Sequence, residues 1–253
     1  MNYSVGKALK YVMLSCIVVV ALFFGSRAIY AHFRAAKLKD PRYTIVAITS
    51  KSRSQESVPH AVFSDLMNLS YDEPSSMYAF DTSQAAKEIY RVPTFKKVKV
   101  QLIKPGIVSV DYELRQPVAE LLDYENRAVD KEGVDFPMLP YITPKNIPRL
   151  YLGALENRRL AFAFELMELA RKILPKEYKL ALCDVSQHFL DSSVCEIDLQ
   201  IDKGNQKLYA RLSSSGYSKD FESLVRLLPA LNVNAKEIVV DLRVAGIGLV
   251  YTS

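Results

Sequence analysis

Residues 97–114 read KVKVQLIKPGIVSVDYEL and carry the clearest structural signal in the chain. Every second residue is apolar in Val98–Leu102 and again in Val108–Leu114, and the segment KPG at 104–106 turns the chain between them. Alternate residues of a strand share one face, so this pattern predicts a β-hairpin with one apolar face. Its polar face sets the lysines of one strand against the acidic residues of the other.

The residues before this hairpin predict a small mixed unit. Tyr43–Thr49 (YTIVAIT) is rich in β-branched residues and predicts a strand. Val58–Leu69 has helical spacing, and a second short helix is expected to begin at Asp81 or Thr82 and to end at Tyr90, before Pro93. With the two hairpin strands, residues 43–115 are expected to run strand, helix, helix, strand, strand.

Residues 116–253 predict a β-rich domain with two helices, so we expect the whole chain to have an α+β fold. Arg158–Leu174 has an apolar stripe at helical spacing, and Phe221–Leu228 has another. The proline-rich passage 137–148 is expected to cross a surface. Strands are expected at the apolar or alternating segments Ala119–Tyr124, Ala128–Phe136, Lys179–Val185, Val194–Ile201, Lys207–Leu212, Ile238–Leu242 and Gly248–Tyr251.

The N-terminal part predicts a membrane anchor. Residues 11–26 carry no charge and include the apolar run VMLSCIVVVALFF at 12–24. At 1.5 Å per residue this uncharged stretch spans roughly 24 Å, slightly less than a hydrocarbon core of about 30 Å. We therefore expect a tail at 1–10, a transmembrane helix at 11–30 and a basic linker at 31–42. A cleaved signal peptide is the alternative, since Ser26–Ala28 is a small-x-small site.

The charges that flank the anchor favour a cytoplasmic location for the C-terminal part of the chain. Lys7 and Lys10 precede the apolar run. Five basic residues follow it: Arg27, Arg34, Lys37, Lys39 and Arg42. The positive-inside rule would keep the C-terminal part in the cytoplasm, although large domains are exported despite such charges.

Composition narrows the class of protein. Of the 253 residues, 49% are hydrophobic and 24% charged, which is typical of globular domains. The net charge of +5 includes the basic linker and indicates contact with anionic lipid headgroups. The sequence has no basic run with interleaved aromatic residues of the kind that binds single-stranded nucleic acid. Cys183 and Cys195 either pair in an oxidising compartment or remain as two reduced core residues.

The sequence offers no convincing active site, so we expect a protein that is not an enzyme, with no cofactor, no metal and no small-molecule substrate. His188 follows Cys183 by five residues, which is one arrangement for a thiol nucleophile with a base. A strand residue followed by a loop histidine explains the same pair. The three histidines (His32, His60 and His188) lack the spacing of metal ligands.

The order of these parts resembles the bacterial FtsQ/DivIB family of cell-division proteins. Residues 108–119 (VSVDYELRQPVA) are similar to the family's stretch ending in Glu-Arg-x-Pro-x-Ala, and 129–136 (VDKEGVDF) to its Val-Asp-x-x-Gly-x-x-Phe turn. Val240–Arg243 resembles the Asp-x-Arg strand that closes the family's second domain. Leu114 departs from the family's usual Glu, and Val244 stands where an aromatic residue is frequent.

This resemblance implies a single-pass protein of the cytoplasmic (inner) membrane, with its N-terminus inside and two extracytoplasmic domains at the division septum. Residues 43–115 would form a POTRA domain and residues 116–253 a β domain. The protein would be a divisome scaffold that binds the single-span proteins FtsB and FtsL. Other division proteins would contact its POTRA domain. The FtsB/FtsL contact would use the last strands, with the candidates Arg243, Val244, Gly246, Leu249, Val250 and Tyr251.

Two other functions stay open from the sequence. A membrane-anchored POTRA module for export or assembly of outer-membrane polypeptides would share the first domain, although such proteins typically carry several units in tandem. A tethered hydrolase would use Cys183 and His188. A single unit followed by a domain with the Asp-Leu-Arg strand argues against the export module, and loss of an activity in Cys183→Ala would be needed to support the hydrolase.

Overall fold

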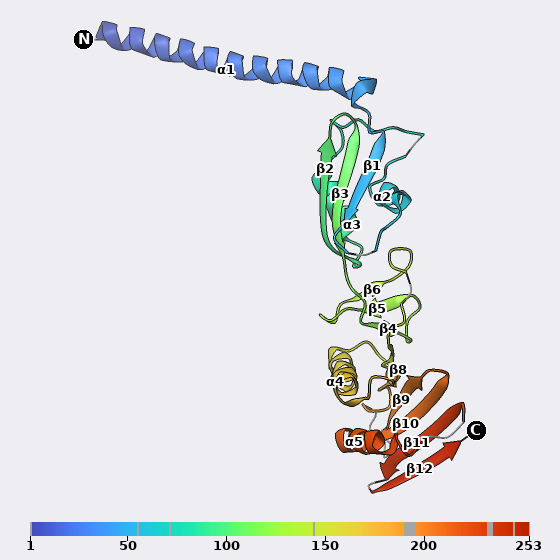
Figure 1. Ribbon diagram of the computed structural model, residues 1–253. Coiled ribbons are helices and arrows are strands. Elements are labelled where there is room, and N and C mark those ends of the chain that lie inside the picture. Colours follow the sequence, from blue (N-terminus) through green and yellow to red (C-terminus); the bar gives the residue numbers. More distant parts are fainter. Residues whose placement is uncertain are drawn as a thin grey trace. The chain divides into compact units, whose positions relative to one another are not determined.

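The computed structural model describes residues 2–252 except 55, 71, 144, 190–195, 232–234 and 245, and of the side chains of residues 2–9 and 11 nothing is described (Figure 1). The chain is a mixed α+β protein that divides into two compact units. Unit 1 comprises Met1–Arg53, Val58–Arg91 and Lys97–Glu113, and unit 2 comprises Ser54–Ser57, Val92–Lys96 and Leu114–Ser253.

The first element is the long apolar helix α1 (Asn2–Leu38). Its part Val12–Leu38 is long and apolar enough to cross a membrane, and its apolar side chains are exposed. The helix continues past residue 30, so most of the predicted linker 31–42 is helical rather than extended. The reason is local: residues 31–38 (AHFRAAKL) contain strong helix formers, and the first proline is Pro41.

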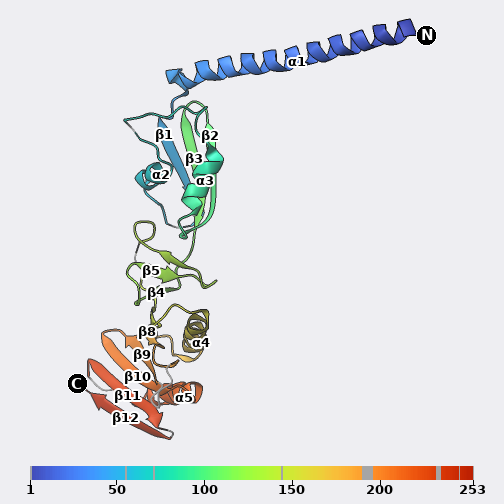
Figure 2. The same cartoon turned by 180° about the vertical axis from the view of Figure 1, so that it is seen from behind.

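Unit 1 then forms a three-stranded sheet with the order β1-β3-β2 and two helices. In Figure 2, α3 lies in front of this sheet. β1 runs parallel to β3, with Ala47 beside Ile107 and Ser52 beside Tyr112. The elements are the 3-10 helix η1 (Pro41–Tyr43), β1 (Ala47–Ser52), α2 (His60–Leu66), α3 (Thr82–Tyr90), β2 (Phe95–Ile103) and β3 (Ile107–Leu114).

The order strand, helix, helix, strand, strand is confirmed, but the first strand starts later than predicted. The Asp40 side chain accepts a hydrogen bond from the Arg42 backbone N–H and so caps the turn at Pro41–Tyr43. This turn takes Tyr43 out of the strand, and β1 begins only at Ala47. The predicted start of α3 is correct, because the Asp81 carboxylate accepts from the N–H groups of Ser83 and Gln84.

The apolar face of the predicted hairpin forms the centre of this unit. Val108, Val110 and Tyr112 of β3 are all buried. Tyr112 packs against Phe63 of α2, and its hydroxyl accepts a hydrogen bond of 2.8 Å from the Val58 backbone N–H. The hydroxyl is thereby satisfied inside the core.

Unit 2 is built on a nine-stranded sheet with the order β12-β11-β10-β9-β8-β7-β4-β5-β6. Its strands and helices are β4 (Ala119–Leu121), β5 (Arg127–Val129), β6 (Asp135–Pro137), β7 (Arg149–Tyr151), α4 (Asn157–Ile173), β8 (Lys179–Asp184), β9 (Glu196–Lys203), β10 (Gln206–Ser213), α5 (Tyr217–Leu227), β11 (Glu237–Val244) and β12 (Ile247–Thr252).

One strand of this sheet was not predicted from the sequence. β7 follows the proline-rich passage 137–148 at once and lies within the sheet, parallel to both β4 and β8. Leu150 is fully buried and pairs with Leu121 and Cys183. Three residues are too few to show the alternation that identifies a strand in the sequence.

Both helices of unit 2 contribute to one core. Figures 1 and 2 show α4 and α5 on the same side of the sheet. Leu160, Ala163 and Leu166 of α4 join Phe221 and Leu224 of α5 in this core. Alternate residues of β10 and β11 are buried there: Leu208, Ala210, Leu212, Ile238, Val240 and Leu242. Most residues on the opposite side of these two strands are polar or charged, so β10 and β11 have one dry face.

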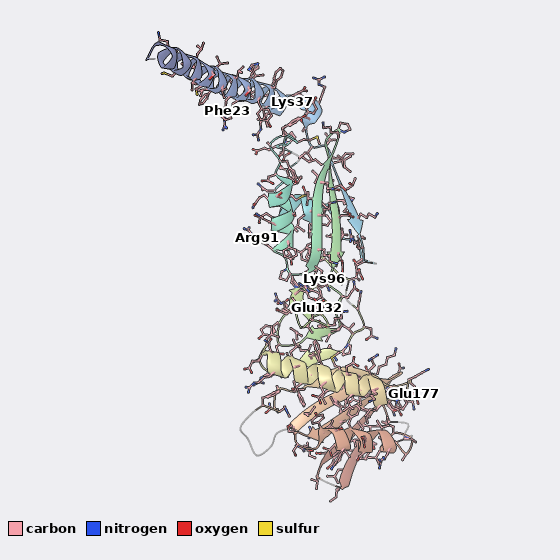
Figure 3. The ribbon with its side chains drawn as sticks, turned by 90° about the vertical axis from the view of Figure 1, so that its left-hand side faces the viewer. Phe23, Lys37, Arg91, Lys96, Glu132 and Glu177 are labelled. Carbon is pink, nitrogen blue, oxygen red and sulfur yellow. The ribbon has the colours of Figure 1, made fainter. Side chains whose placement is uncertain are left out.

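A buried ion pair holds the start of unit 2. The guanidinium of Arg115 lies 2.7 Å from the carboxylate of Asp130, and the two side chains are 14% and 5% exposed. The other oxygen of Asp130 accepts from the backbone N–H groups of Glu132 and Val134. Glu132 also pairs with Lys96, and both are labelled in Figure 3. The Val-Asp-x-x-Gly turn is therefore fixed by one carboxylate.

We expect Asp130→Ala to lower the free energy of unfolding by about 3 kcal/mol, because it leaves the Arg115 guanidinium without its buried carboxylate. Glu132→Ala should cost less than about 1 kcal/mol: Glu132 is 45% exposed and lies farther from Arg115, at 3.3 Å, and ion pairs of exposed carboxylates contribute little. Urea unfolding of a fragment that begins at Asp40, followed by circular dichroism, measures both. Equal losses in the two variants would contradict this assignment.

Candidate functional site

The last strand, β12, is one of the two outer strands of the nine-stranded sheet. It pairs antiparallel with β11, with Val250 opposite Val240 and Tyr251 opposite Val239. Within the part of the chain that the structure describes, no strand pairs with its other side. An outer strand presents N–H and C=O groups that a further strand can use.

The side chains of β12 are unusually open for an apolar strand. Ile247, Leu249, Val250 and Tyr251 are between 43% and 58% exposed. Apolar residues of the neighbouring β11 are buried at every second position. The edge therefore combines unpaired backbone with accessible apolar surface, the two features that strand addition uses.

The two faces of β12 differ. Leu249 and Tyr251 lie opposite Asp241 and Val239, on the face that carries the charged residues. Val250 lies opposite Val240, on the face that the helices cover. Gly248 packs closely on the core: a Cβ there would lie 3.2 Å from Leu242, a tight contact, and 3.5 Å from Leu227 of α5. A strand added to β12 would thus extend the core on one side and meet charges on the other.

A short connection joins β11 to β12. Val244 ends β11, is 58% exposed and pairs with Ile247. Gly246 has a φ of +76°, a conformation that glycine adopts without the steric cost of a Cβ. The ladder is irregular between Asp241 and Val244. Gly246, which was predicted as a partner contact, is therefore a turn residue that sets the position of β12.

Arg243 is less available than the other candidates. Its guanidinium lies 2.6 Å from the Asp241 carboxylate on the same strand and also pairs with Glu196 of β9. The hydrogen bonds that Arg243 donates to the Asp241 carboxylate lower the pKa of Asp241 and raise the pKa of Arg243. Asp241 and Arg243 therefore form a partly exposed ion pair on β11, and a partner would have to compete for this arginine.

The free edges of the two sheets differ in how they are protected. β1 carries Lys51, β2 carries Lys96, Lys97 and Lys99, and β6 carries Asp135 and ends at Pro137. Charged residues and proline on an edge discourage pairing with another chain. The sequence of β12, IGLVYT, contains neither. β12 is therefore the edge best suited to accept a strand.

The structure brings five of the six predicted residues onto or beside this edge: Val244, Gly246, Leu249, Val250 and Tyr251. It adds Ile247 and Thr252, which belong to β12 although the predicted strand covered only 248–251. Alternation could have found Ile247, because it continues the series of Leu249 and Tyr251. Thr252 lies at the end of the strand, where sequence patterns are weakest.

The geometry does not favour the alternative thiol site. Cys183 lies in the interior of β8 and is fully buried, and its thiol is free. Burial, with a smaller contribution from Asp184, raises its pKa to about 12, so the thiolate needed for attack is disfavoured. Cys195 lies outside the described residues, so both alternatives for this cysteine, a disulfide with Cys183 or a reduced thiol, stay predictions.

His188 has a packing role instead. Its ring stacks on Phe162 of α4, with the centroids 4.0 Å apart, and Nδ1 lies 2.9 Å from the Ser214 hydroxyl. Burial lowers its pKa. Among the described residues no cluster of three His, Cys, Asp or Glu side chains could hold a metal ion.

Comparison with known proteins adds no assignment. No protein-family model matches the chain, and no curated protein matches it.

We expect the charge pair beside the edge to give a pH-dependent contribution to stability. Because the folded-state pKa of Asp241 is lowered, the ionised form stabilises the fold above the ordinary pKa near 3.8, and this contribution is lost as the pH falls through the folded value. Wild type should therefore exceed Asp241→Asn in free energy of unfolding at pH 5, with a smaller difference at pH 3. Urea unfolding at both pH values gives the result. A difference that does not change with pH would mean that Asp241 is unpaired.

Proposed function

We propose that this chain is a membrane-anchored, non-enzymatic scaffold of the bacterial divisome. It binds single-span proteins of the FtsB and FtsL type by accepting a strand at β12, links early and late division proteins at the septum and so influences septal peptidoglycan synthesis. Residues 43–115 act as a POTRA domain and residues 116–253 as a β domain, both outside the cytoplasmic membrane.

The observation that carries this proposal is the state of β12. It is an outer strand with exposed apolar side chains and neither charge nor proline, whereas the other three edges carry such residues. Natural proteins protect edges against unwanted pairing, so an unprotected edge argues for a partner strand. The resemblance of Val240–Arg243 to the family's closing strand supports the same end of the sheet.

Two further features support the rest of the proposal. α1 is long and apolar enough for a single membrane crossing, which suits a tethered scaffold. The order strand, helix, helix, strand, strand in unit 1 is the order expected of a POTRA domain. The export of both domains rests on the family resemblance, against the positive charges that follow the apolar run.

The site can be tested by placing a charge on the edge. Tyr251→Lys should weaken binding to the extracytoplasmic segments of the same organism's FtsB and FtsL by at least about tenfold, because the ammonium must lose water when a strand covers it. Tyr90→Lys is the matched control, since Tyr90 is 57% exposed in unit 1. Titration calorimetry with a fragment that begins at Asp40 gives both affinities. Equal affinity in the two variants would move the site away from β12.

The backbone contribution needs a second pair of variants. Neighbouring residues of a strand direct their N–H groups to opposite sides, so one of Leu249→Pro and Val250→Pro removes a donor toward β11 and the other a donor at the free edge. We expect both to abolish binding and only one to lower the melting temperature markedly, as seen by circular dichroism. Full binding by the variant that keeps its stability would contradict strand addition.

A further inference from the structure

The turn between β2 and β3 lies at the same end of the sheet as residues 44–46, which follow α1 and η1 in the chain. The backbone N–H of Val46 donates to the Gly106 carbonyl at 2.8 Å. Gly106 has a φ of +78°, and a Cβ there would lie 2.3 Å from the Thr44 carbonyl oxygen. The turn at 104–106 is therefore packed directly against residues 44–46.

This tip of the unit is apolar and exposed. Val46 is 75% exposed, more than any other large apolar side chain that the structure describes outside α1, and Ile103 at the end of β2 is 48% exposed. Lys104 and Pro105 are also exposed. Two open aliphatic side chains beside a lysine form the kind of surface that enters a lipid interface, where the apolar groups insert and the ammonium reaches the headgroups.

The length of the chain keeps this tip at the bilayer. If residues 11–30 fill the hydrocarbon core, the eight residues 31–38 rise about 12 Å, against a headgroup layer of roughly 5 to 8 Å. Only Lys39 and Asp40 separate α1 from η1, which allows at most about 10 Å more. The first residues of unit 1 therefore start within a short distance of the lipid surface.

We propose that Val46 and Ile103 insert into the headgroup region of the bilayer that α1 crosses, with Lys104 beside them, and so hold unit 1 against the membrane in a fixed orientation. This inference rests on α1 being a retained anchor, as in the proposed function, but not on any partner of β12. It also holds for either side of the membrane, because the tether is the same.

Charge alone does not drive this contact. The basic residues near the tip are Lys37, Lys39 and Lys104, while Arg42 is paired with Asp40. Asp72 and Glu73 belong to the loop whose Ser75 carbonyl accepts from the Ile45 N–H, so acidic groups oppose the lysines. The apolar side chains are the main contribution, and we expect binding to neutral as well as anionic lipid.

The absence of tryptophan from the sequence provides a direct test. Single tryptophans at Val46→Trp and Ile103→Trp are introduced into the full chain, which is placed in nanodiscs with lipids brominated near the top of the acyl chains. We expect about a twofold loss of emission at both positions, because interfacial side chains lie within roughly 10 Å of the acyl region. Phe23→Trp in α1, labelled in Figure 3, is the positive control.

Tyr90→Trp is the matched negative control. Tyr90 is 57% exposed and ends α3, and β2 starts five residues later, about 26 Å from its far end at Ile103. Quenching of the two tip variants together with Phe23→Trp, and not of Tyr90→Trp, supports the inference. If Phe23→Trp is quenched and the tip variants match Tyr90→Trp, the inference is overturned while the anchor stands. If Phe23→Trp itself is not quenched, the anchor is wrong and the inference falls with it.

Discussion

An open β-sheet has to end in two strands whose outer backbone groups find no partner within it, and this constraint determines where unit 2 can accept a strand from another chain. The nine-stranded sheet of unit 2 ends at β6 on one side and at β12 on the other. β6 is only three residues long and ends at Pro137, which leaves little backbone for another chain. β12 is six residues long and uncharged, so its open backbone and side chains are the largest unprotected edge of the sheet.

The neighbours of β12 make this edge a stable platform. β11 buries Ile238, Val240 and Leu242 against the core beneath α5, and it is parallel to β10 through the crossover that α5 provides. Gly248 lies so close to Leu242 and Leu227 that β12 sits tightly on this layer. The pair of Arg243 with Asp241 and Glu196 ties β11 to β9 on the other face. A strand accepted by β12 would therefore join an already ordered sheet, which lowers the entropy cost of binding.

The sequence predicts the local elements well and the long-range pairing poorly. The hairpin of β2 and β3, the cap of α3 at Asp81 and the helix α4 follow from alternation, capping and helical spacing, which depend on nearby residues only. β7 was missed because it is three residues long and acquires its structure from β4 and β8, which are distant in sequence. α1 extends further than expected because nothing in residues 31–38 stops a helix. The candidates at 244–251 were placed at an edge by resemblance, but the exposure of Ile247 and the contrast with the other edges require the order of the strands.

The most direct test of strand addition at β12 is hydrogen exchange of the backbone amides, followed in the full chain in nanodiscs with and without the extracytoplasmic segments of the same organism's FtsB and FtsL. We expect exchange to slow in residues 247–252 when the partner segments are added, because the free N–H groups of β12 become hydrogen bonded. The edges β1, β2 and β6 should keep their rates. Protection that arises at one of those edges, or nowhere in the sheet of unit 2, would contradict the assignment of β12 as the site where a partner strand is added.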